Sequence, residues 1–267
     1  MKQKGKVYLI GAGPGHPELL TVKAARVIQE ADAVVFDRLV SPEILSLICE
    51  TALQVPVGKS ADNHPVPQER INEILKDLAQ KGMVVARLKG GDPLIFGRGS
   101  EEAEYLRAND VTVEYVPGIT AAQGMAASTG VPLTHRGLAT GVRYVTGHRQ
   151  ANGSLDLDWK SLACTDTTLV IYMGVANIAQ ISMRLQAEGL SEDTPVLAVA
   201  SATTPREKRV YSRLGRIAAD IHDAGLKAPV LFVIGKVVMM GEDWQTNTVE
   251  EILSAARVDT CGKLAHG

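Results

Sequence analysis

The stretch VYLIGAGPGHPELLT, residues 7–21, decides the fold of the first half of the chain. A short apolar strand leads into a glycine-rich turn, and a nucleotide-binding turn of this kind follows the pattern G-x-G-x-x-G before a helix. Gly11 and Gly13 fit this pattern, but its third glycine position holds His16. The stretch therefore predicts a strand, a turn and a helix beside a bound ligand. The glycine pattern alone does not decide the class of that ligand.

The chemistry of this turn favours a ligand without phosphate. Pro14 and Pro17 lack a backbone N–H group, whereas a pyrophosphate is bound by N–H groups at a helix N-terminus. S-adenosylmethionine carries no phosphate, and its cationic sulfonium prefers strand-end carbonyls and carboxylates to the positive end of a helix dipole. A nicotinamide oxidoreductase stays open as an alternative, because Asp37 lies where a ribose-binding acid is expected.

Strand-like and helix-like segments alternate through the first half of the chain. Near-continuous apolar strands that alternate with helices predict an α/β domain with a mainly parallel sheet covered on both faces. Residues 68–82 place apolar side chains at helical spacing, and Gly82 ends that helix. The other segments are strands at 7–10, 33–36, 83–89 and 111–116 and helices at 18–30, 42–48 and 100–108.

A second α/β domain is expected after residues 130–141, because three glycines and a proline in this segment are typical of a linker. Two strand-like runs within 195–212 flank a turn too short for a helix, so they are expected to pair antiparallel and to give this domain a mixed sheet. We place the domains at residues 1–136 and 137–244, followed by a polar tail at 245–267.

The composition is that of an ordinary globular protein, with 45% hydrophobic and 22% charged residues. A formal net charge of −2 and an aromatic content of 4% argue against binding to nucleic acid or to an anionic membrane. No apolar run is long enough for a signal peptide or a membrane span, so a cytoplasmic location is expected. The three cysteines lie far apart and the histidines lack ligand spacing, so no metal is expected.

Three glycine-containing turns each follow a predicted strand and precede a predicted helix. They lie in the segments LIGAGPGH (9–16), ARLKGGDPLIFGRGSEE (86–102) and EYVPGITAAQGMAAS (114–128). In an open parallel sheet such turns emerge together at the carboxyl edge of the strands, where ligands bind. The sequence therefore predicts a ligand site at this edge.

Five segments together resemble the tetrapyrrole (corrin/porphyrin) methylases, and the resemblance extends from about Lys6 to about Asp243. It implies two α/β domains with S-adenosylmethionine in the cleft between them, and a homodimer. It also implies the transfer of two methyl groups to C2 and C7 of uroporphyrinogen III, which gives precorrin-2 for sirohaem, cobalamin or haem d1. The segments are VYLIGAGPGHPELLTVKAARVI (7–28), VVFDRLVSPEIL (34–45), VGKSADNHPVPQERIN (57–72), RLKGGDPLIFGRGSEE (87–102) and VPGITAAQGMAASTGVPLTHR (116–136).

For the methyl donor, the resemblance implies three walls from the first domain and a cover from the second. Pro14 also has a structural interpretation as a turn residue, and Asp92 has one as the acid of a turn before Pro93. The three-turn pattern favours ligand contact for both. The implied donor residues are Pro14, Gly90, Gly91, Asp92, Ile95, Thr120, Ala121, Met173, Ala202 and Ala228.

For the tetrapyrrole, the resemblance implies Arg98, Glu101 and Arg136. The guanidinium fork of arginine suits a substrate that carries eight carboxylates. Glu101 also has a structural interpretation, because an acid in the first helical turn after Ser100 as N-cap is favoured by the helix dipole.

For the chemistry, Asp37 resembles the family's proton acceptor and Lys59 its proton donor. A methylase that acts on a later corrinoid stays open as an alternative, and it would differ around residues 58–70 and 134–136. An NAD-dependent oxidoreductase is opposed by Pro14 and His16. A non-catalytic binding module would have no need of paired Asp37 and Lys59.

Overall fold

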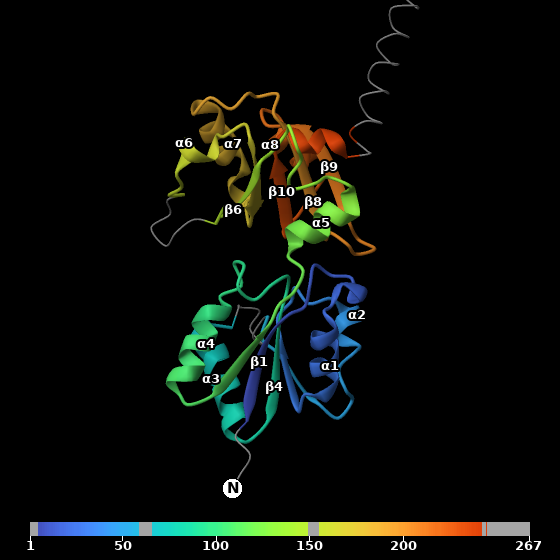
Figure 1. Ribbon diagram of the computed structural model, residues 1–267, viewed down its shortest axis with the longest axis vertical. Helices are drawn as coiled ribbons and strands as arrows, with labels where there is room; N and C mark the ends of the chain where they lie inside the picture. The colour runs from blue at the N-terminus through green and yellow to red at the C-terminus, as the bar shows by residue number, and fades with distance from the viewer. Residues whose placement is uncertain (1–4, 59–65, 149–154, 242–243, 245–267) are drawn as a thin grey trace, which may run out of the picture. The chain divides into compact units, whose positions relative to one another are not determined.

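The computed structural model describes residues 5–58, 66–148, 155–241 and 244 of the 267. They form two compact units (Figure 1). The first runs to Gly124 and includes the short segment Ala202–Pro205, and the second comprises Met125–Ser201 and the described residues from Arg206 onward. The predicted boundary after residue 136 falls later along the chain than this division, and the domain limits stay a prediction.

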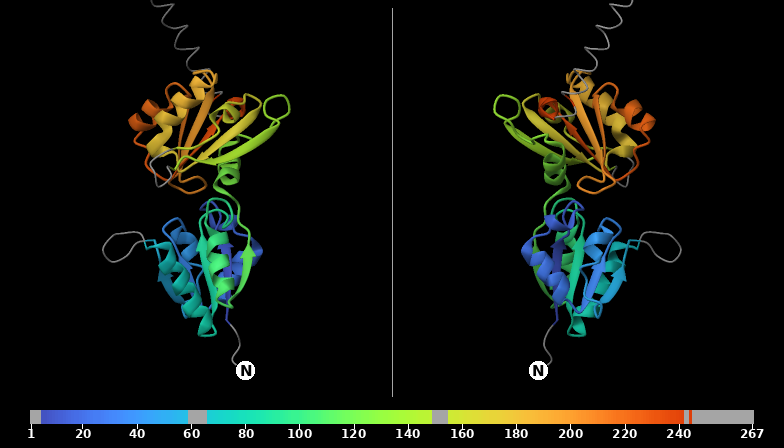
Figure 2. Two further views of the ribbon diagram at one scale, coloured as in Figure 1. Left: turned by 90° about the vertical axis from the view of Figure 1, so that its left-hand side faces the viewer. Right: turned by 90° about the vertical axis from the view of Figure 1, so that its right-hand side faces the viewer.

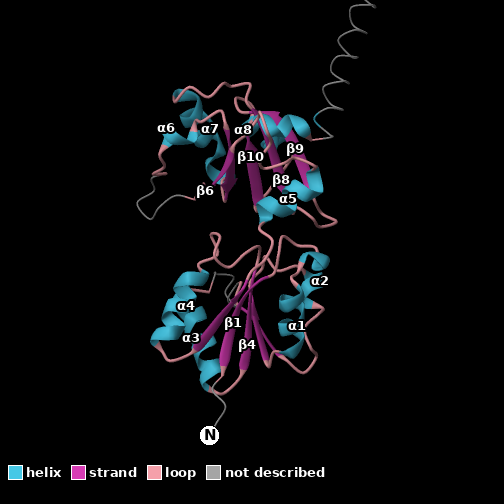
Figure 3. Cartoon of the chain, in the orientation of Figure 1, coloured by secondary structure: helices cyan, strands magenta, loops and turns pink. Residues whose placement is uncertain are grey.

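The first unit is built on a five-stranded sheet of order β3-β2-β4-β1-β5. Figure 3 shows its strands in magenta between helices. Every pair of neighbouring strands is parallel, which confirms the predicted parallel sheet. Its strands are β1 (Lys6–Gly11), β2 (Ala33–Phe36), β3 (Leu53–Pro56), β4 (Val84–Lys89) and β5 (Thr112–Val116), and its helical segments are η1 (Pro17–Leu19), α1 (Val22–Glu30), α2 (Pro42–Leu45), α3 (Gln68–Gln80) and α4 (Gly99–Ala108), with α5 (Ala121–Thr129) following β5.

Helices cover both faces of this sheet (Figures 1 and 2). Side chains alternate between the two faces along a strand, so neighbours such as Leu9 and Ile10 enter different cores. Leu9 and Val85 pack on one face with α3 and α4, and Ile10 and Leu88 pack on the other with α1 and α2. Strands buried on both faces explain the near-continuous apolar runs of the sequence.

Two helices predicted for this unit differ from the structure, and one of its strands was not predicted. The helix expected at 18–30 is divided, because Thr21 is extended and its Oγ1 accepts a hydrogen bond from Ala24 N (3.1 Å), so that Thr21 caps α1. The helix expected at 42–48 is the shorter α2, and the edge strand β3 was not predicted. Most residues of strand β3 are exposed, so its sequence lacks the apolar pattern of the other strands.

The second unit contains a five-stranded sheet of order β6-β7-β10-β8-β9. Strands β6 and β7 are parallel and the other neighbouring pairs are antiparallel, which confirms the predicted mixed sheet and the antiparallel pair within 195–212. Its elements are β6 (Gly141–Thr146), α6 (Trp159–Leu162), β7 (Thr167–Tyr172), η2 (Val175–Asn177), α7 (Ile178–Ala187), β8 (Pro195–Ala200), β9 (Lys208–Arg213), α8 (Ile217–Asp223), β10 (Val230–Ile234) and η3 (Lys236–Met240).

Candidate functional site

The three glycine-containing turns meet at the carboxyl edge of the first sheet, as predicted. They follow β1, β4 and β5, which lie side by side in the order β4-β1-β5. Gly13 and Gly91 exchange two backbone hydrogen bonds, with nitrogen–oxygen distances of 2.7 and 3.1 Å. The third turn packs on the other two at Gly118, where a Cβ would lie 2.3 Å from the Gly91 carbonyl oxygen and 2.7 Å from Gly11 Cα. Only glycine fits such a close approach of backbones.

Asp92 connects two of these turns. Its Oδ1 accepts a hydrogen bond from Leu94 N (2.8 Å), which is the Asx turn that the sequence offered as the structural interpretation. Its Oδ2 accepts a hydrogen bond from Gly118 N in the third turn (3.0 Å). Asp92 therefore fixes the second turn against the third, and its contact with the methyl donor stays a prediction.

The third turn enters α5 through a capping box formed by Thr120 and Gln123. Thr120 N donates to Gln123 Oε1 (3.1 Å), and Gln123 N donates to Thr120 Oγ1 (3.3 Å). Pro14 of the first turn lies against this helix, since a Cβ on Gly124 would be 2.5 Å from Pro14 Cβ and Cγ. Of the residues assigned to the first and third walls, Pro14, Thr120 and Ala121 thus belong to turns that the structure brings together.

The segment between Asp92 and Arg98 is strained and partly exposed. Phe96 and Arg98 have φ angles of 53° and 58°, a left-handed conformation that costs of the order of 1–3 kcal/mol for a residue with a side chain. Ile95, assigned to the second wall, has 36% of its surface exposed. Gly90 is close to Leu39, because a Cβ on Gly90 would be 2.9 Å from Leu39 Cβ.

Arg98 and Glu101 form an ion pair on the surface of α4. Arg98 Nη2 lies 2.7 Å from Glu101 Oε2, and its Nε lies 3.1 Å from Oε1, so both arms of the carboxylate are engaged. The hydrogen bond from Arg98 lowers the pKa of Glu101, and the same contact raises the pKa of Arg98. Both side chains are about half exposed, so the pair contributes little to stability.

The prediction that Ser100 is the N-cap of this helix is wrong. Helix α4 begins at Gly99, and Arg98 is its N-cap. The left-handed φ of Arg98 turns the chain early, and Gly99 N donates to Pro93 O (2.9 Å), which closes the turn before the helix. Glu101 still lies in the first helical turn.

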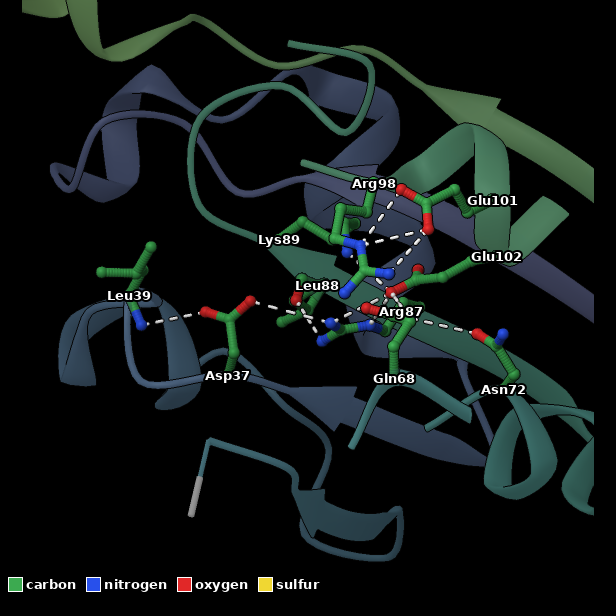
Figure 4. A network of polar contacts seen from close by, with 10 residues as sticks. All are labelled: Asp37, Leu39, Gln68, Asn72, Arg87, Leu88, Lys89, Arg98, Glu101 and Glu102. Atoms are coloured by element: carbon green, nitrogen blue, oxygen red, sulfur yellow. Dashed lines mark hydrogen bonds and ion pairs between the residues drawn. The ribbon is translucent and has the colours of Figure 1, made fainter. Parts of the chain in front are cut away.

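Asp37 follows β2 at the same carboxyl edge, and it is held at both carboxylate oxygens. Oδ1 accepts a hydrogen bond from Leu39 N (2.9 Å), and Oδ2 lies 3.7 Å from Arg87 Nη2 (Figure 4). The side chain of Asp37 is one-quarter exposed, whereas that of Arg87 is buried. The role of Asp37 as the proton acceptor stays a prediction. Its predicted partner Lys59 lies outside the described residues.

The remaining predicted residues lie apart from the three turns along the chain. Met173 follows β7 with a φ of 55° and is half exposed, and Arg136 is exposed in the turn bridged by His135 and Ala139. Ala228 is exposed just before β10. All three belong to the second unit, whereas Ala202 is buried in the short segment that belongs to the first. Their roles toward the donor or the tetrapyrrole stay predictions.

The sequence interpretation missed a buried polar network beneath Asp37 and Arg98 (Figure 4). Arg87 and Lys89 lie two positions apart on one face of β4, and they are 2% and 4% exposed. Glu102 of α4 is fully buried between them. Glu102 Oε1 accepts from Lys89 Nζ (2.7 Å), Arg87 Nη2 (3.3 Å) and Gln68 Nε2 (3.1 Å). Glu102 Oε2 has no hydrogen-bond partner among the described residues. The sequence signal for this network was a pair of cations two positions apart in an otherwise apolar strand. Residues at this spacing share one face of the strand, so both cations face the same neighbours.

Burial and charge act against each other in this network. Burial raises the pKa of Glu102, but Arg87 and Lys89 together outweigh burial, so the pKa of Glu102 lies below its usual range. Burial and the nearby charge of Arg87 lower the pKa of Lys89, and Glu102 opposes this only in part. Glu102 is therefore ionised at neutral pH and holds two buried cations in place.

The first turn is poorly suited to bind a phosphate. Pro14 and Pro17 lack the backbone N–H groups that would bind one there. Among the described residues no group of histidine, cysteine and acidic side chains is arranged to bind a metal. Within the same ranges, no helix has both the length and the apolar character needed to cross a membrane.

Comparison with known proteins identifies similar chains. The model of the family Tetrapyrrole (Corrin/Porphyrin) Methylases matches residues 6–218. Uroporphyrinogen-III C-methyltransferase of Paracoccus denitrificans is 57% identical over 239 residues, which are 90% of this chain and 83% of that protein. A sirohaem synthase of Acinetobacter baylyi is 50% identical over 91% of this chain, which spans 53% of that longer protein.

A solved structure with the same architecture contains the product of a methyl donor. Uroporphyrin-III C-methyltransferase of Thermus thermophilus, in complex with S-adenosylhomocysteine, superposes with a TM-score of 0.75 and 42% sequence identity. The match covers 88% of this chain and 99% of that one. The similarity therefore extends over both sheets rather than over one motif.

Proposed function

The chain belongs to the tetrapyrrole (corrin/porphyrin) methylases, and from this membership we propose that it methylates uroporphyrinogen III at C2 and C7 to give precorrin-2. It is an S-adenosylmethionine-dependent methyltransferase, and S-adenosylhomocysteine is the second product. The observation that carries the proposal is the meeting of three glycine turns beside Asp37, in a chain whose relatives are named for this reaction.

We assign the methyl donor to the walls formed by these turns and the tetrapyrrole to the more exposed groups around them. Arg98, Glu101 and Arg136 handle the tetrapyrrole in this assignment, and the two arginines pair with its carboxylates. A homodimer is part of the same proposal. The donor residues are Pro14, Gly90, Gly91, Asp92, Ile95, Thr120, Ala121, Met173, Ala202 and Ala228.

The donor supplies an electrophilic methyl group on a sulfonium, whose positive charge is lost as the methyl is transferred. The protein therefore has to align the two substrates, exclude water and accept a proton from the macrocycle. Alignment contributes up to about 7–11 kcal/mol through effective molarity, and a positioned base contributes roughly 10²–10⁴-fold. Asp37 Oδ1 accepts the hydrogen bond from Leu39 N and Oδ2 lies 3.7 Å from Arg87 Nη2, so the carboxylate is held in place for this proton transfer. Lys59 returns a proton in the same scheme.

The reaction is tested by incubating the protein with labelled S-adenosylmethionine and uroporphyrinogen III. We expect two methyl groups per macrocycle, and one S-adenosylhomocysteine bound per chain in calorimetry without added metal. Methylation of a later corrinoid instead of uroporphyrinogen III would favour the sibling methylases. Binding of NAD without binding of S-adenosylhomocysteine would overturn the whole assignment.

Replacing Asp37 with asparagine is expected to lower turnover at least tenfold and to leave S-adenosylhomocysteine affinity near the wild-type value. Asparagine keeps the shape and the acceptor for Leu39 N, but it cannot accept the proton. Steady-state kinetics and calorimetry on the same preparation measure the two quantities. Unchanged turnover would remove Asp37 from the mechanism.

Replacing Arg98 with alanine is expected to weaken tetrapyrrole binding about 10- to 100-fold, since a charge-assisted pair with a carboxylate contributes ~1.5–3 kcal/mol. Arg98→Lys is expected to recover only part of the affinity, because lysine restores the charge without the fork. The measurement is the Kd of each variant for the tetrapyrrole and for S-adenosylhomocysteine.

A matched control for this prediction is Arg70→Ala. Arg70 forms a similar exposed pair with Glu73, three residues further along α3 (2.8 Å). Its removal is expected to change neither affinity. If Arg98→Ala instead reduces S-adenosylhomocysteine affinity and spares the tetrapyrrole, Arg98 has been assigned to the wrong ligand.

A further inference from the structure

We infer that Arg87 is a positioning residue for methyl transfer, which holds the carboxylate of Asp37 in place from beneath the site. The inference rests on the proposed function, in which Asp37 accepts the proton. Arg87 itself is too deeply buried to touch the substrates, with 3% of its side chain exposed. It acts through Asp37, whose Oδ2 lies 3.7 Å from Arg87 Nη2.

The guanidinium of Arg87 is fixed by contacts on two other sides. Its Nη1 donates to Leu88 O (3.0 Å), and its Nε and Nη2 lie 3.4 and 3.3 Å from Glu102 Oε1. A planar group with such contacts presents Nη2 to Asp37 from a defined position, which a flexible surface cation does not. Leu39 N holds the other carboxylate oxygen, so the two contacts together set the plane of the Asp37 carboxylate.

The same network reaches the groups assigned to the tetrapyrrole (Figure 4). Lys89, two residues beyond Arg87 on the same face of β4, donates to Glu102 Oε1 at 2.7 Å. Glu102 is next to Glu101, which pairs with Arg98 on the surface of α4. Strand β4 and helix α4 thus connect the proton acceptor and the tetrapyrrole pair through one buried carboxylate. This arrangement explains why two cations are kept in a strand whose other inward residues are apolar.

The test is a double-variant cycle on turnover with Arg87→Met and Asp37→Asn. Arg87→Met is expected to fold, because Glu102 keeps Lys89 and Gln68 as partners. We expect Arg87→Met to lower kcat about 10- to 100-fold, since a misplacement of about 1 Å has effects of this size. KM for the tetrapyrrole and the affinity for S-adenosylhomocysteine are expected to stay near wild type. In the Asp37→Asn background, adding Arg87→Met is expected to lower kcat by less than a further threefold.

Two further variants provide a conservative replacement of Arg87 and a control at an unrelated cation. Arg87→Lys restores the charge without the planar group, so it is expected to recover part of kcat. Arg26→Met removes an exposed cation paired with Glu30 on α1 and is expected to leave kcat unchanged. Additive losses in the cycle would overturn the inference, and so would equal losses of kcat and S-adenosylhomocysteine affinity. If the wild type methylates a different tetrapyrrole, only the proposed function is contradicted. The inference about Arg87 is then tested by measuring the same double-variant cycle on that other substrate.

Discussion

Replacing Glu102 with alanine is expected to lower the free energy of unfolding by about 3–5 kcal/mol, because it leaves two buried cations without their shared carboxylate. Arg87 and Lys89 are 2% and 4% exposed, so water compensates little for the lost carboxylate. The loss of van der Waals contacts around the removed side chain adds to the effect. Urea denaturation of the purified chain, monitored for each unfolding transition, measures the difference.

Two companion variants separate charge from volume in this prediction. Glu104→Ala, on the exposed face of the same helix, is expected to change stability by less than about 0.5 kcal/mol. Glu102→Gln keeps the volume and removes the charge, so it is expected to retain most of the loss seen with alanine. If Glu102→Gln is as stable as the wild type, the carboxylate charge has no structural role and our account of the network is wrong.

The pH dependence of this effect has a definite sign. The two cations hold the pKa of Glu102 below its usual range in the folded protein. A carboxyl group of this kind contributes stability above its unfolded pKa of about 4.3, and the contribution is lost as the pH falls through the folded value. The difference in stability between the wild type and Glu102→Gln is therefore expected to be full at pH 7 and to shrink below about pH 4.

Replacing Gly118 with alanine is expected to abolish S-adenosylhomocysteine binding and to destabilise the first domain by about 3 kcal/mol or more. The new Cβ would lie 2.3 Å from the Gly91 carbonyl oxygen and 2.7 Å from Gly11 Cα. Both neighbours are backbone atoms, so no side-chain rotation relieves the clash. The second and third turns have to separate, and the hydrogen bond from Gly118 N to Asp92 Oδ2 is then lost.

The control for this prediction is Gly141→Ala in β6. A Cβ on Gly141 finds its nearest neighbour, Thr167 Cγ2, at 4.0 Å, which is ordinary contact. This variant is expected to bind S-adenosylhomocysteine as the wild type does. Wild-type affinity in Gly118→Ala, measured by calorimetry, would show that the close contact of the turns is not needed for the donor.

The parts of the fold that follow from periodicity were predictable from the sequence. Buried strands of the first sheet appear as apolar runs, and the absence of a helix within 195–212 fixes the antiparallel pair of the second. The shared edge of the three turns followed from the rule for open parallel sheets, and the bridge between Gly13 and Gly91 confirms it. The exposed edge strand β3 has no such pattern, so it was missed.

The contacts made across the fold were not predictable in the same way. Ser100 is a good N-cap by residue type, but the left-handed backbone of Arg98 places the N-cap two residues earlier, at Arg98. Glu102 has the sequence position of an acid that favours the helix dipole, and only the packing of α4 on β4 shows that it binds Arg87 and Lys89. A buried ion pair depends on how a helix and a strand pack against each other. This packing cannot be derived from a single sequence.

The backbone bridge between Gly13 and Gly91 has a consequence for protein engineering. Two turns that exchange backbone hydrogen bonds cannot change length independently, because an inserted residue in one removes the partner of the other. A chimaera that takes the first turn from a distant relative therefore inherits a mismatch unless the second turn comes with it. The contact of Gly118 with both extends this to the third turn. Grafting in this fold has to transfer all three turns as one cassette, although they are separated by more than sixty residues of intervening chain at the widest gap.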